Sequence, residues 1–576
     1  NTPTQHLLCD LISELLHTPH TTLDDNFFNL GGDSILSIQL VSRARKAGLA
    51  VTAREVYQAR TVEELAAACT VHEPASPRKP DQGDTHVPLS PIMRWLEEQR
   101  GTVAGYNQAV LLRVPVGLGV EPLQLALAAL LRTHDLLRSH LQRDASGKAT
   151  QLIVPGADEV LPPTVLRVDV SELTEDGRRA AVAAEARHAR ARLSPEEGRM
   201  VQAVWFDHGP RTPGRLLLML HHLVVDGVSW RIILPDLREA WTALSAGEEV
   251  LLEPAGTSFG GWARHLREEA RAERRTGELD IWLDATRPAP LVPDGALDPA
   301  RDTFGTSRSH TFELSERETE SLLTTVPARF HAGVNDVLLT AVALAGVRWR
   351  SERFAVPGTH LTVAVEGHGR EDLLPGADLS RTVGWFTSVY PVSLNPGEVS
   401  WPELLTDATA TGAALKRVKE QLHDLPDHGI GYGLLRHLNP GTAAVLADRA
   451  EPQIGFNYLG RMPDGRNQEW TAAWDEEVPA SGASADMAMS HLLEISAVTV
   501  EGTDGPRLVI ELQWVPALLP EPGVRSFADL LAQVLGAFVE HVDRGEAGGY
   551  TPSDLPLVSL SQDEIDDLEA MFRDRA

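Results

Sequence analysis

A polar, proline-rich stretch at residues 71–88 divides the chain into two unequal parts. It reads VHEPASPRKPDQGDTHVP, and its prolines and few apolar residues are typical of a linker between folded domains. The part before it is short, whereas the part after it is longer than one hydrophobic core usually organises. We therefore expect a small first domain, a linker, and a long second part that folds as two lobes.

The short first part has the periodicity of helices. Residues 5–16, QHLLCDLISELL, repeat apolar side chains at helical spacing, and a second such pattern begins at Ser34 and stops at Gly48. Thr61 and Glu64 have the spacing of a capping box in front of a third apolar run. These signals predict a small helical bundle.

The long second part alternates strand-like and helix-like runs. Short runs rich in β-branched and large apolar residues predict strands, and longer amphipathic runs between them predict helices. This alternation favours an α/β or α+β architecture. The strand-like runs are AVLLRVPV, RLLLMLHHLVV, HLTVAVEG, SVYPVSL and RLVIELQWV, and the helical runs include PLQLALAALLRTHDLL, DVLLTAVALAGVRWR and SFADLLAQVLGAFVEHV.

Charge and hydropathy argue against several classes of protein. A formal net charge of −29 disfavours a nucleic-acid partner, because phosphate backbones are bound by basic surfaces. No apolar run approaches the roughly 18 residues that a membrane-spanning helix needs, and the first residues lack the pattern of a secretory signal. The chain begins at Asn1 rather than Met, so we expect an excerpt of a longer, cytoplasmic polypeptide without a membrane partner.

The segment LGGDSILSIQL, residues 30–40, places Ser34 directly after two glycines and an aspartate, at the start of an amphipathic helix. A flexible turn exposes a hydroxyl in that position. The free N–H groups and the positive dipole end of the helix would stabilise a phosphodiester attached to it. The alternative interpretation is that Asp33 or Ser34 only caps the helix.

The string HHLVVDGVSW, residues 221–230, follows the strand-like RLLLML. Neighbouring residues of a strand point to opposite sides, so at most one of His221 and His222 can face a given cavity. An imidazole takes and gives protons near neutral pH, which suits a general acid or base. Metal binding is the competing interpretation, but no third ligand stands at a recognisable spacing, and we predict no metal site.

Both strings belong to wider patterns that resemble known families. Residues 1–72, with GG-x-S followed by Ile35, resemble the peptidyl carrier (thiolation) domain of nonribosomal peptide synthetases. The resemblance implies an all-α four-helix bundle with 4′-phosphopantetheine attached covalently to Ser34. An aspartate before the serine is the variant typical of carriers that serve epimerization domains.

HH-x₃-DG is the signature of the condensation-domain superfamily, whose two-lobed α/β fold resembles chloramphenicol acetyltransferase. The resemblance implies that His222 is the active histidine and His221 a packed structural one. It also implies that Asp226 holds the loop of the motif through an arginine. The candidate for that arginine is Arg138, in RTHDLLRSHL.

The remaining pattern is similar to that of epimerization domains within this superfamily. Glu366 lies in VEGHGRED directly after the strand-like LTVAV, and amide-forming members lack a carboxylate at that place. We expect Glu366 at the end of a strand that lines the cleft between the lobes. The other matching segments follow the order of the family and are LSPIMRWLEEQ (89–99), NDVLL (335–339), RTVGWFTSVYPVSL (381–394), PDHGIGYGLLR (426–436) and FNYLGRM (456–462).

The implied activity is inversion, from L to D, of the α-carbon of an aminoacyl or peptidyl thioester tethered to Ser34. His222 and Glu366 would move the proton on opposite faces of that carbon. Asn457 and Tyr458 are candidates for stabilising the enolate or reprotonating it, with core packing as the other role for Tyr458. Two rival functions are a condensation domain that forms an amide bond and a docking scaffold without catalysis.

Lysine and cysteine usage bears on other racemase chemistries. The lysines lie in polar, exposed-looking sequence surroundings, which disfavours a pyridoxal Schiff base. Cys9 and Cys69 both belong to the first part, so a facing thiol pair in the second part is disfavoured as well. We therefore expect cofactor-free proton transfer, with phosphopantetheine as the tether only.

The expected organisation has five parts. They are a carrier domain (1–72), a linker (73–86), the first lobe (87–265), the second lobe (266–548) and a linker or docking tail (549–576). The resemblance implies three partners, namely an upstream adenylation domain, a downstream condensation domain and the phosphopantetheinyl transferase that loads Ser34.

Overall fold

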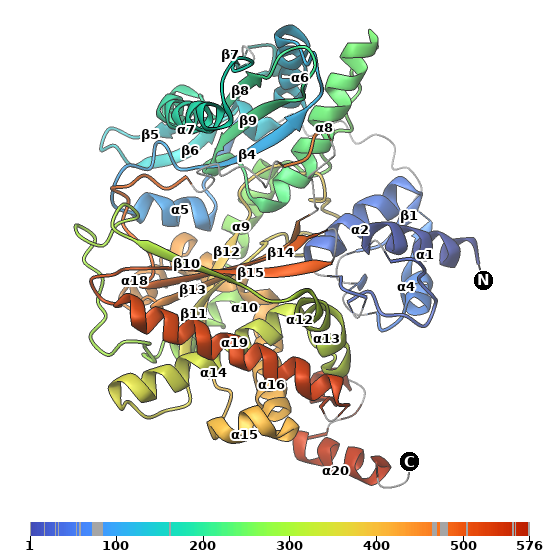
Figure 1. Cartoon of the computed structure of the whole chain (residues 1–576), viewed down its shortest axis with the longest axis vertical. Coiled ribbons are helices and arrows are strands. Elements are labelled where there is room, and N and C mark those ends of the chain that lie inside the picture. The colour runs from blue at the N-terminus through green and yellow to red at the C-terminus, as the bar shows by residue number, and fades with distance from the viewer. Residues whose placement is uncertain are drawn as a thin grey trace.

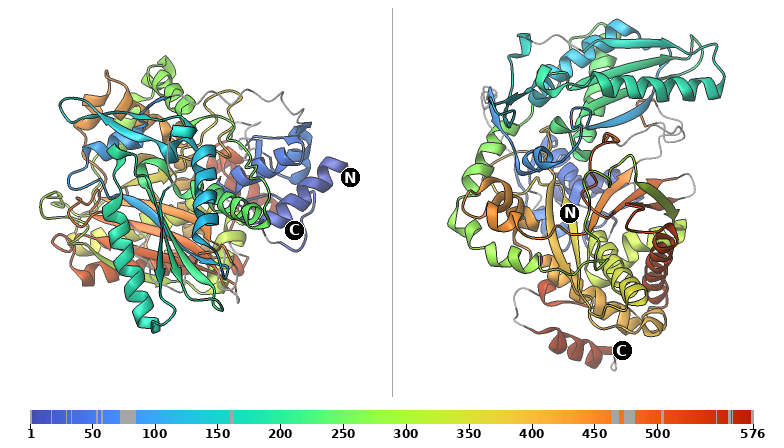
Figure 2. Two further views of the ribbon diagram at one scale, coloured as in Figure 1. Left: turned by 90° about the horizontal axis from the view of Figure 1, so that it is seen from above. Right: turned by 90° about the vertical axis from the view of Figure 1, so that its left-hand side faces the viewer.

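The computed structural model describes residues 2–573 except 17, 29, 33, 53–54, 57–58, 72–84, 160–162, 463–468, 473–481, 503–504, 546, 556–557 and 559. Two lobes, each built on its own sheet, lie one above the other in Figure 1 and in the right-hand view of Figure 2. The short N-terminal part lies beside the second lobe (Figure 1). The expected linker at 73–86 falls largely outside the described residues.

The N-terminal part contains the predicted helices. They are α1 (Pro3–Leu16), α2 (Ser34–Lys46) and α4 (Val62–Ala68), and the two-residue strands β1 (Leu49–Ala50) and β2 (Thr70–Val71) pair with each other. The side chain of Thr61 caps α4 by accepting from the Glu64 N–H at 3.1 Å, as its sequence pattern predicts. Between β1 and α4, residues 53–54 and 57–58 lie outside the described part, so the fourth helix of the expected bundle stays a prediction.

The first lobe is built on a four-stranded sheet. Its order is β4 (Asn107–Val114), β9 (Gly214–His221), β8 (Val201–Asp207) and β7 (Val165–Asp169). A second, three-stranded sheet holds β3 (His86–Pro88), β6 (Ala149–Ile153) and β5 (His140–Arg143). The helices are α5 (Pro91–Glu98), α6 (Val120–Thr133), α7 (Glu175–Arg192), α8 (Gly227–Ala246) and α9 (Phe259–Glu269). The expected boundary at 265/266 falls inside α9.

Strand β9 is buried along its whole length because both faces of its sheet are covered. Leu216, Leu218 and Leu220 join the core with α6 and α8, whereas Leu217 and Met219 join the one with α7. A strand covered on both sides reads as a continuous apolar run, which explains RLLLML. The histidines at its end therefore project from a rigid central strand.

The second lobe is built on a mixed six-stranded sheet. Strand β13 (Ile454–Met462) pairs in parallel with β11 (Leu361–Gly367) and β14 (Leu493–Glu501), and the other pairs are antiparallel. The outer strands are β12 (Ser388–Leu394) beside β11, and β15 (Pro506–Trp514) and β10 (Arg308–Glu313) beyond β14. Its helices are α10 (Glu273–Thr276), α11 (Leu279–Ala285), α12 (Glu316–Glu320), α13 (Val326–Phe330), α14 (Val334–Phe354), α15 (Trp401–Thr406), α16 (Ala408–His423), α17 (Ile430–Gly433), α18 (Ala443–Ala447), α19 (Glu521–Asp543) and α20 (Gln562–Arg573).

The two faces of this sheet differ in polarity. One face contributes Val365, Phe456 and Ile495 to the core formed with α14, α16 and α19, which lie below the sheet in Figure 1. By strand register the other face carries Glu366, Asn457, Glu494, Ser496 and Glu511. Val389, opposite Glu366 in the register, packs against the core of the first lobe, so the polar face turns toward that lobe.

In the described part of the chain, no single helix has the length and apolar composition to cross a bilayer. The segments Glu316–Phe330 and Val334–Phe354, bent by 97°, meet that test only as a pair.

Candidate active site

Strand β9 and the turn after it hold the two histidines differently. His221 ends β9 and is buried. Its Nε2 donates to the carbonyl oxygen of Val103 at 3.0 Å, and its Nδ1 accepts from the N–H of Leu223 at 3.1 Å. Burial lowers the pKa of His221 to about 4, so the ring is neutral. With both nitrogens engaged, His221 fixes the turn that presents His222.

The His222 ring lies in an aromatic setting. It stacks on Tyr106, with ring centroids 4.9 Å apart and planes 10° apart, and its centroid lies 4.3 Å from that of Trp385. Burial lowers the pKa of His222 to about 4, outweighing the contributions of its own backbone and of Asp226. The imidazole is therefore neutral at physiological pH.

A hydrogen-bond chain defines which nitrogen of His222 carries the proton. The indole N–H of Trp230 can only donate, and it donates to Oε1 of Gln108 at 2.7 Å. The amide nitrogen of Gln108 therefore faces Nε2 of His222, at 3.0 Å, and donates to it. Consequently Nε2 has the lone pair, which accepts from Gln108, and Nδ1 has the proton.

Asp226 joins the two lobes through Arg370. The guanidinium of Arg370 donates to both carboxylate oxygens of Asp226, at 2.7 and 3.1 Å, and both side chains are buried. Asp226 also caps α8 by accepting from the N–H and Oγ of Ser229, at 2.8 and 2.7 Å. Burial alone would raise the pKa of Asp226, but Arg370 and Ser229 together hold it below its usual value.

The sequence-based choice of Arg138 as the partner of Asp226 is wrong. Arg138 instead donates to the carbonyl oxygens of Leu131 and Pro155, at 2.6 and 3.0 Å, and to Asp135 at 2.9 Å. These bonds hold the turn after α6. The actual partner, Arg370, belongs to the EGHGRED segment, four residues after Glu366.

Glu366 and Asn457 meet on the polar face of the second sheet. The amide nitrogen of Asn457 donates to Oε2 of Glu366 at 2.7 Å. Burial among protein groups, and then the negative charge of Glu494, raise the pKa of Glu366 to about 7, while His491 opposes them. The side chain nevertheless remains accessible to solvent, as a group that meets a substrate must be.

Tyr106 connects the surroundings of His222 with those of Glu366. Burial raises the pKa of Tyr106 above its usual value, and the negative charges of Glu366 and Glu494 add to the effect. The same tyrosine stacks on His222. The histidine of the first lobe and the carboxylate of the second lobe are thus both near one aromatic side chain.

Tyr458 lies on the opposite face of β13 from Asn457. Its hydroxyl and the hydroxyl of Thr499 are 3.1 Å apart, and its ring packs against the core of the second lobe. Of the two roles considered for Tyr458, the structure favours core packing. Alternation along a strand requires one of two neighbouring residues to face away from the site.

Several site residues were missing from the sequence-based set. Tyr106 and Gln108 belong to a strand-like stretch that matched no motif, although a glutamine in the run NQAVLLRV is a polar outlier. Trp385 and Arg370 lie inside the quoted motifs but were not singled out. The sequence around Glu494 does not indicate a place in the site, because the proximity of Glu494 to Glu366 depends on the order of the strands in the sheet.

Two lysines are not exposed as their sequence surroundings suggested. Lys416 is paired with Asp566 at 2.7 Å, and Lys419 with Asp554 at 2.6 Å, and both lysines are buried. These pairs attach the C-terminal segment to α16. Among the described residues, no group of three or more His, Cys, Asp and Glu side chains is arranged to hold a metal ion.

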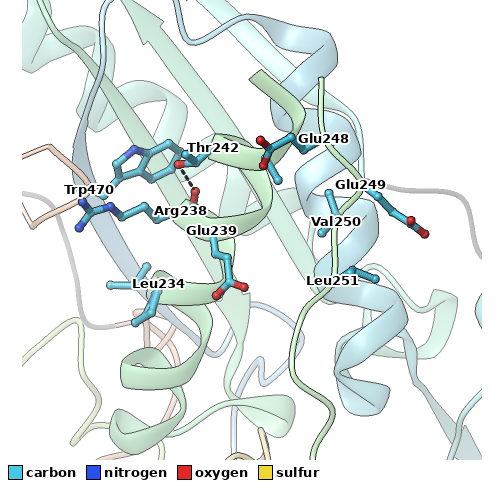
Figure 3. Close-up of a pocket in the computed structure, with 11 residues that line it drawn as sticks. Leu234, Arg238, Glu239, Thr242, Glu248, Glu249, Val250, Leu251 and Trp470 are labelled. Atoms are coloured by element: carbon cyan, nitrogen blue, oxygen red, sulfur yellow. Dashed lines mark hydrogen bonds between the residues drawn. The ribbon is translucent and has the colours of Figure 1, made fainter. Parts of the chain in front are cut away.

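A cavity of about 580 Å³ lies elsewhere, along the second half of α8 (Figure 3). Arg238, Glu239 and Thr242 line it from the helix, and Leu251 and Trp470 line it from other segments. None of the predicted site residues borders this cavity. Its position does not bear on the chemistry of His222 and Glu366.

Family models match almost the whole chain. The condensation domain matches residues 84–554, and the phosphopantetheine attachment site matches residues 6–69. The chain belongs to the condensation-domain family. An N-terminal phosphopantetheine-binding domain precedes the condensation-family domain, as the GGDS and HH-x₃-DG motifs predicted.

Similar curated proteins are subunits of peptide synthases. Linear gramicidin synthase subunits C, D and B from Brevibacillus parabrevis are 37%, 36% and 38% identical over 94%, 98% and 97% of this chain. The chain spans only 7%, 11% and 10% of the lengths of these relatives.

Solved structures support the two-lobed fold. The epimerization domain from the third module of tyrocidine synthetase B is 28% identical, with a TM-score of 0.68, and the match covers 80% of this chain and 99% of that one. The first condensation domain of the calcium-dependent antibiotic synthetase, 20% identical with a TM-score of 0.54, covers 80% of this chain and 97% of that one. The latter likeness concerns the fold alone.

The N-terminal part has the geometry that phosphopantetheine attachment requires. Helix α2 begins at Ser34 itself, so a phosphate on that residue would meet the free N–H groups of the helix N-terminus. Gly31 has a φ of +95°, and a side chain on Gly32 would collide with Phe27. The two glycines therefore allow a tight turn in front of the serine. The residues present fit the cofactor.

Proposed function

We propose that the chain is an epimerase that inverts the α-carbon of an aminoacyl or peptidyl thioester held by phosphopantetheine on Ser34. The observation that supports this most is Glu366, a carboxylate with a pKa raised to about 7 on the sheet face turned toward the first lobe. The likeness to a solved epimerization domain, at 28% identity, supports it further.

The reaction needs two proton-transfer groups and no oxidant or reductant. One group removes the α-proton, and the electron pair of the broken C–H bond moves into the thioester carbonyl as an enolate. A second group then delivers a proton to the opposite face of the carbon, forming the new C–H bond. Groups with a pKa near the working pH are suited to such transfers, a condition that Glu366 meets and that His222, with a pKa of about 4, meets only as a neutral acceptor.

The protonation states of His222 and Glu366 fit these two tasks. At pH 7 His222 is neutral with its lone pair on Nε2, while the raised pKa of Glu366 lets its carboxyl hold a proton near neutral pH. The pair therefore offers an acceptor and a donor at once. Asn457 orients Glu366, and the Asp226–Arg370 pair holds the two motif segments together across the lobes.

The wider setting of this function is part of the same proposal. Residues 1–72 would fold as a four-helix carrier bundle, 87–265 and 266–548 would form the lobes, and 549–576 a docking tail. An upstream adenylation domain would load the amino acid, a phosphopantetheinyl transferase would prime Ser34, and a downstream condensation domain would take the D-product. All these steps would take place in the cytoplasm.

The test uses the full chain, loaded on Ser34 with an L-aminoacyl phosphopantetheine and incubated in heavy water. The wild-type protein should yield D-product and deuterium at the α-carbon. His222→Ala and Glu366→Gln should each lower the rate about 10²-fold or more, in the range of general acid–base catalysis. Glu511→Gln, on the same sheet face, should retain the wild-type rate.

Two results would contradict the proposal. If the wild-type chain leaves the configuration unchanged and takes up no deuterium at the α-carbon, epimerization of the aminoacyl substrate is excluded. The same assay with a peptidyl substrate on Ser34 is then the second arm of the experiment. Amide formation with an acceptor carrier, without inversion in either arm, would instead identify a condensation domain.

A further inference from the structure

Arg461 of β13 lies against the loop that precedes Ser34. Its Nη1 is 3.5 Å from the carbonyl oxygen of Gly31, and a side chain on Gly31 would approach the same nitrogen to 2.7 Å. The strand register shifts between Tyr458 and Arg461, where Gly460 has a φ of +75°. Such a bulge redirects the side chains that follow it, here toward the N-terminal domain.

The guanidinium of Arg461 is held in one orientation. Its Nε donates to Oε1 of Glu501 at 2.6 Å, and the carbonyl oxygen of Arg461 accepts from Arg231 at 3.2 Å. The terminal nitrogens consequently turn toward the carrier loop. A planar guanidinium matches the geometry of a phosphate, which its N–H groups can bind through two bonds, and the long 3.5 Å bond from Nη1 to Gly31 is the contact that a phosphate would replace.

Gly31 is only three residues from Ser34, so the attachment point lies within about 10 Å of the Arg461 contact. Helix α2 begins at Ser34. A phosphodiester on Ser34 would therefore be at a helix N-terminus and within reach of an arginine of the other domain.

We propose that Arg461 binds the phosphodiester of the phosphopantetheine on Ser34 and so selects the loaded carrier for docking. The ligand is the phosphate group itself, whatever acyl group the arm carries. From Arg461, β13 runs back to Asn457, whose amide donates to Glu366 on the adjacent strand β11. This role rests on the phosphopantetheine attachment site and goes beyond the proposed epimerase activity.

The test is ³¹P NMR of the full chain with phosphopantetheine on Ser34 and no acyl group. In the wild-type protein the phosphodiester should give a broad, shifted resonance. In Arg461→Gln its linewidth should fall about twofold or more, because a released carrier tumbles faster than the 576-residue chain. Arg461→Lys, which keeps the charge but loses the fork, should give an intermediate linewidth.

The matched control is Arg507→Gln, which removes an arginine of β15 that is paired with Glu313 of β10 in the same sheet. Its ³¹P spectrum should equal that of the wild type, and both glutamine variants should keep the wild-type unfolding temperature. A narrow wild-type resonance, or an Arg461→Gln spectrum equal to the wild type, would overturn the assignment. Because the probe carries no amino acid, the outcome is independent of whether the chain epimerizes.

Discussion

At the residue scale, the two proposed proton-transfer groups differ in their surroundings. Burial lowers the pKa of His222 to about 4, whereas burial and Glu494 raise that of Glu366 to about 7. Burial disfavours the charged form in both cases, which moves a base and an acid in opposite directions. Environments that drive the protonation states of two groups apart in this way are typical of acid/base pairs.

Glu494 sets part of the acidity of Glu366. Glu494→Gln removes a negative charge without changing the shape of the side chain, so the pKa of Glu366 should fall below about 7. The limb of the pH–rate profile that reports Glu366 should then move to lower pH, by about half a unit to one unit for charges across a partly solvated site. The rate of α-proton exchange, measured between pH 5 and 9, checks this.

Glu511→Gln is the matched control for Glu494→Gln, because Glu511 shares the polar face but lies on β15. Its pH–rate profile should overlay that of the wild type. A profile of Glu494→Gln that does not move, or moves to higher pH, would mean that Glu494 does not act on the group that limits the rate.

The site residues that belong to recognisable motifs were predictable from the sequence, but the side chains that contact them were not. HH-x₃-DG and EGHGRED indicated His222, Asp226 and Glu366. The ion pair between Asp226 and Arg370, however, spans 144 positions and forms only after the two lobes assemble. Spacing along the chain carries no information on such a contact, so Arg138 was an equally acceptable arginine until the fold was known.

At the element scale, strand periodicity predicted β9, β11 and β15. It did not predict which face of each strand turns toward the candidate site and which toward the core. The alternation in FNYLGRM required Asn457 and Tyr458 to point apart. Only the sheet order β14-β13-β11 showed that Asn457 reaches Glu366. The bulge before Arg461 was equally hidden, because its marker is a single glycine at positive φ.

The turn Pro426–Gly429 is stabilised by ion pairs of its two central residues. Asp427 and His428 both adopt left-handed backbone, with φ of 42° and 51°, a conformation that costs non-glycine residues about 1–2 kcal/mol each. Nδ1 of His428 bonds the carboxylate of Glu371, which is 11% exposed, at 2.8 Å, and Asp427 is paired with Arg275. These partners stabilise the strained turn against the segment that carries Arg370.

The His428–Glu371 pair predicts a pH dependence of stability. The bond to Glu371 raises the pKa of His428 above its usual value. Its contribution is therefore fully present below the unfolded-state pKa of about 6.5 and is lost as pH rises through the folded-state pKa. His428 is 61% exposed, so we expect less than about 1 kcal/mol.

His428→Lys keeps a cation at alkaline pH and serves as the comparison. The unfolding temperature of the wild type should fall more between pH 6 and pH 8.5 than that of the lysine variant. Equal changes in the two proteins would show that the histidine does not titrate as part of this turn.

At the scale of the whole molecule, composition and motifs predicted the order of the parts, and the fold added the contacts among them. The C-terminal segment is held to α16 by Lys416 and Lys419. The carbonyl oxygen of Asp554, in that segment, also accepts from Arg60 of the carrier at 2.9 Å. The tail therefore contacts both the second lobe and the carrier, which no local sequence signal indicated.

The carrier is held near the candidate site by contacts at both ends of α2. Arg45, near its C-terminal end, pairs with Asp378, and the loop before its first residue meets Arg461.

The Arg45–Asp378 ion pair predicts an effect on the rate. Arg45→Glu reverses the charge of one partner. Because the pair is partly exposed, losing it costs about 1 kcal/mol or less, to which the repulsion between the introduced glutamate and Asp378 adds. The rate of inversion within a preloaded chain should therefore fall about threefold to tenfold, with the unfolding temperature unchanged. Arg43→Glu makes the same charge change on the same helix and should leave the rate near that of the wild type. Single-turnover measurements on the three proteins decide the point, since equal rates for Arg45→Glu and Arg43→Glu would mean that the Asp378 pair does not guide the carrier to the site.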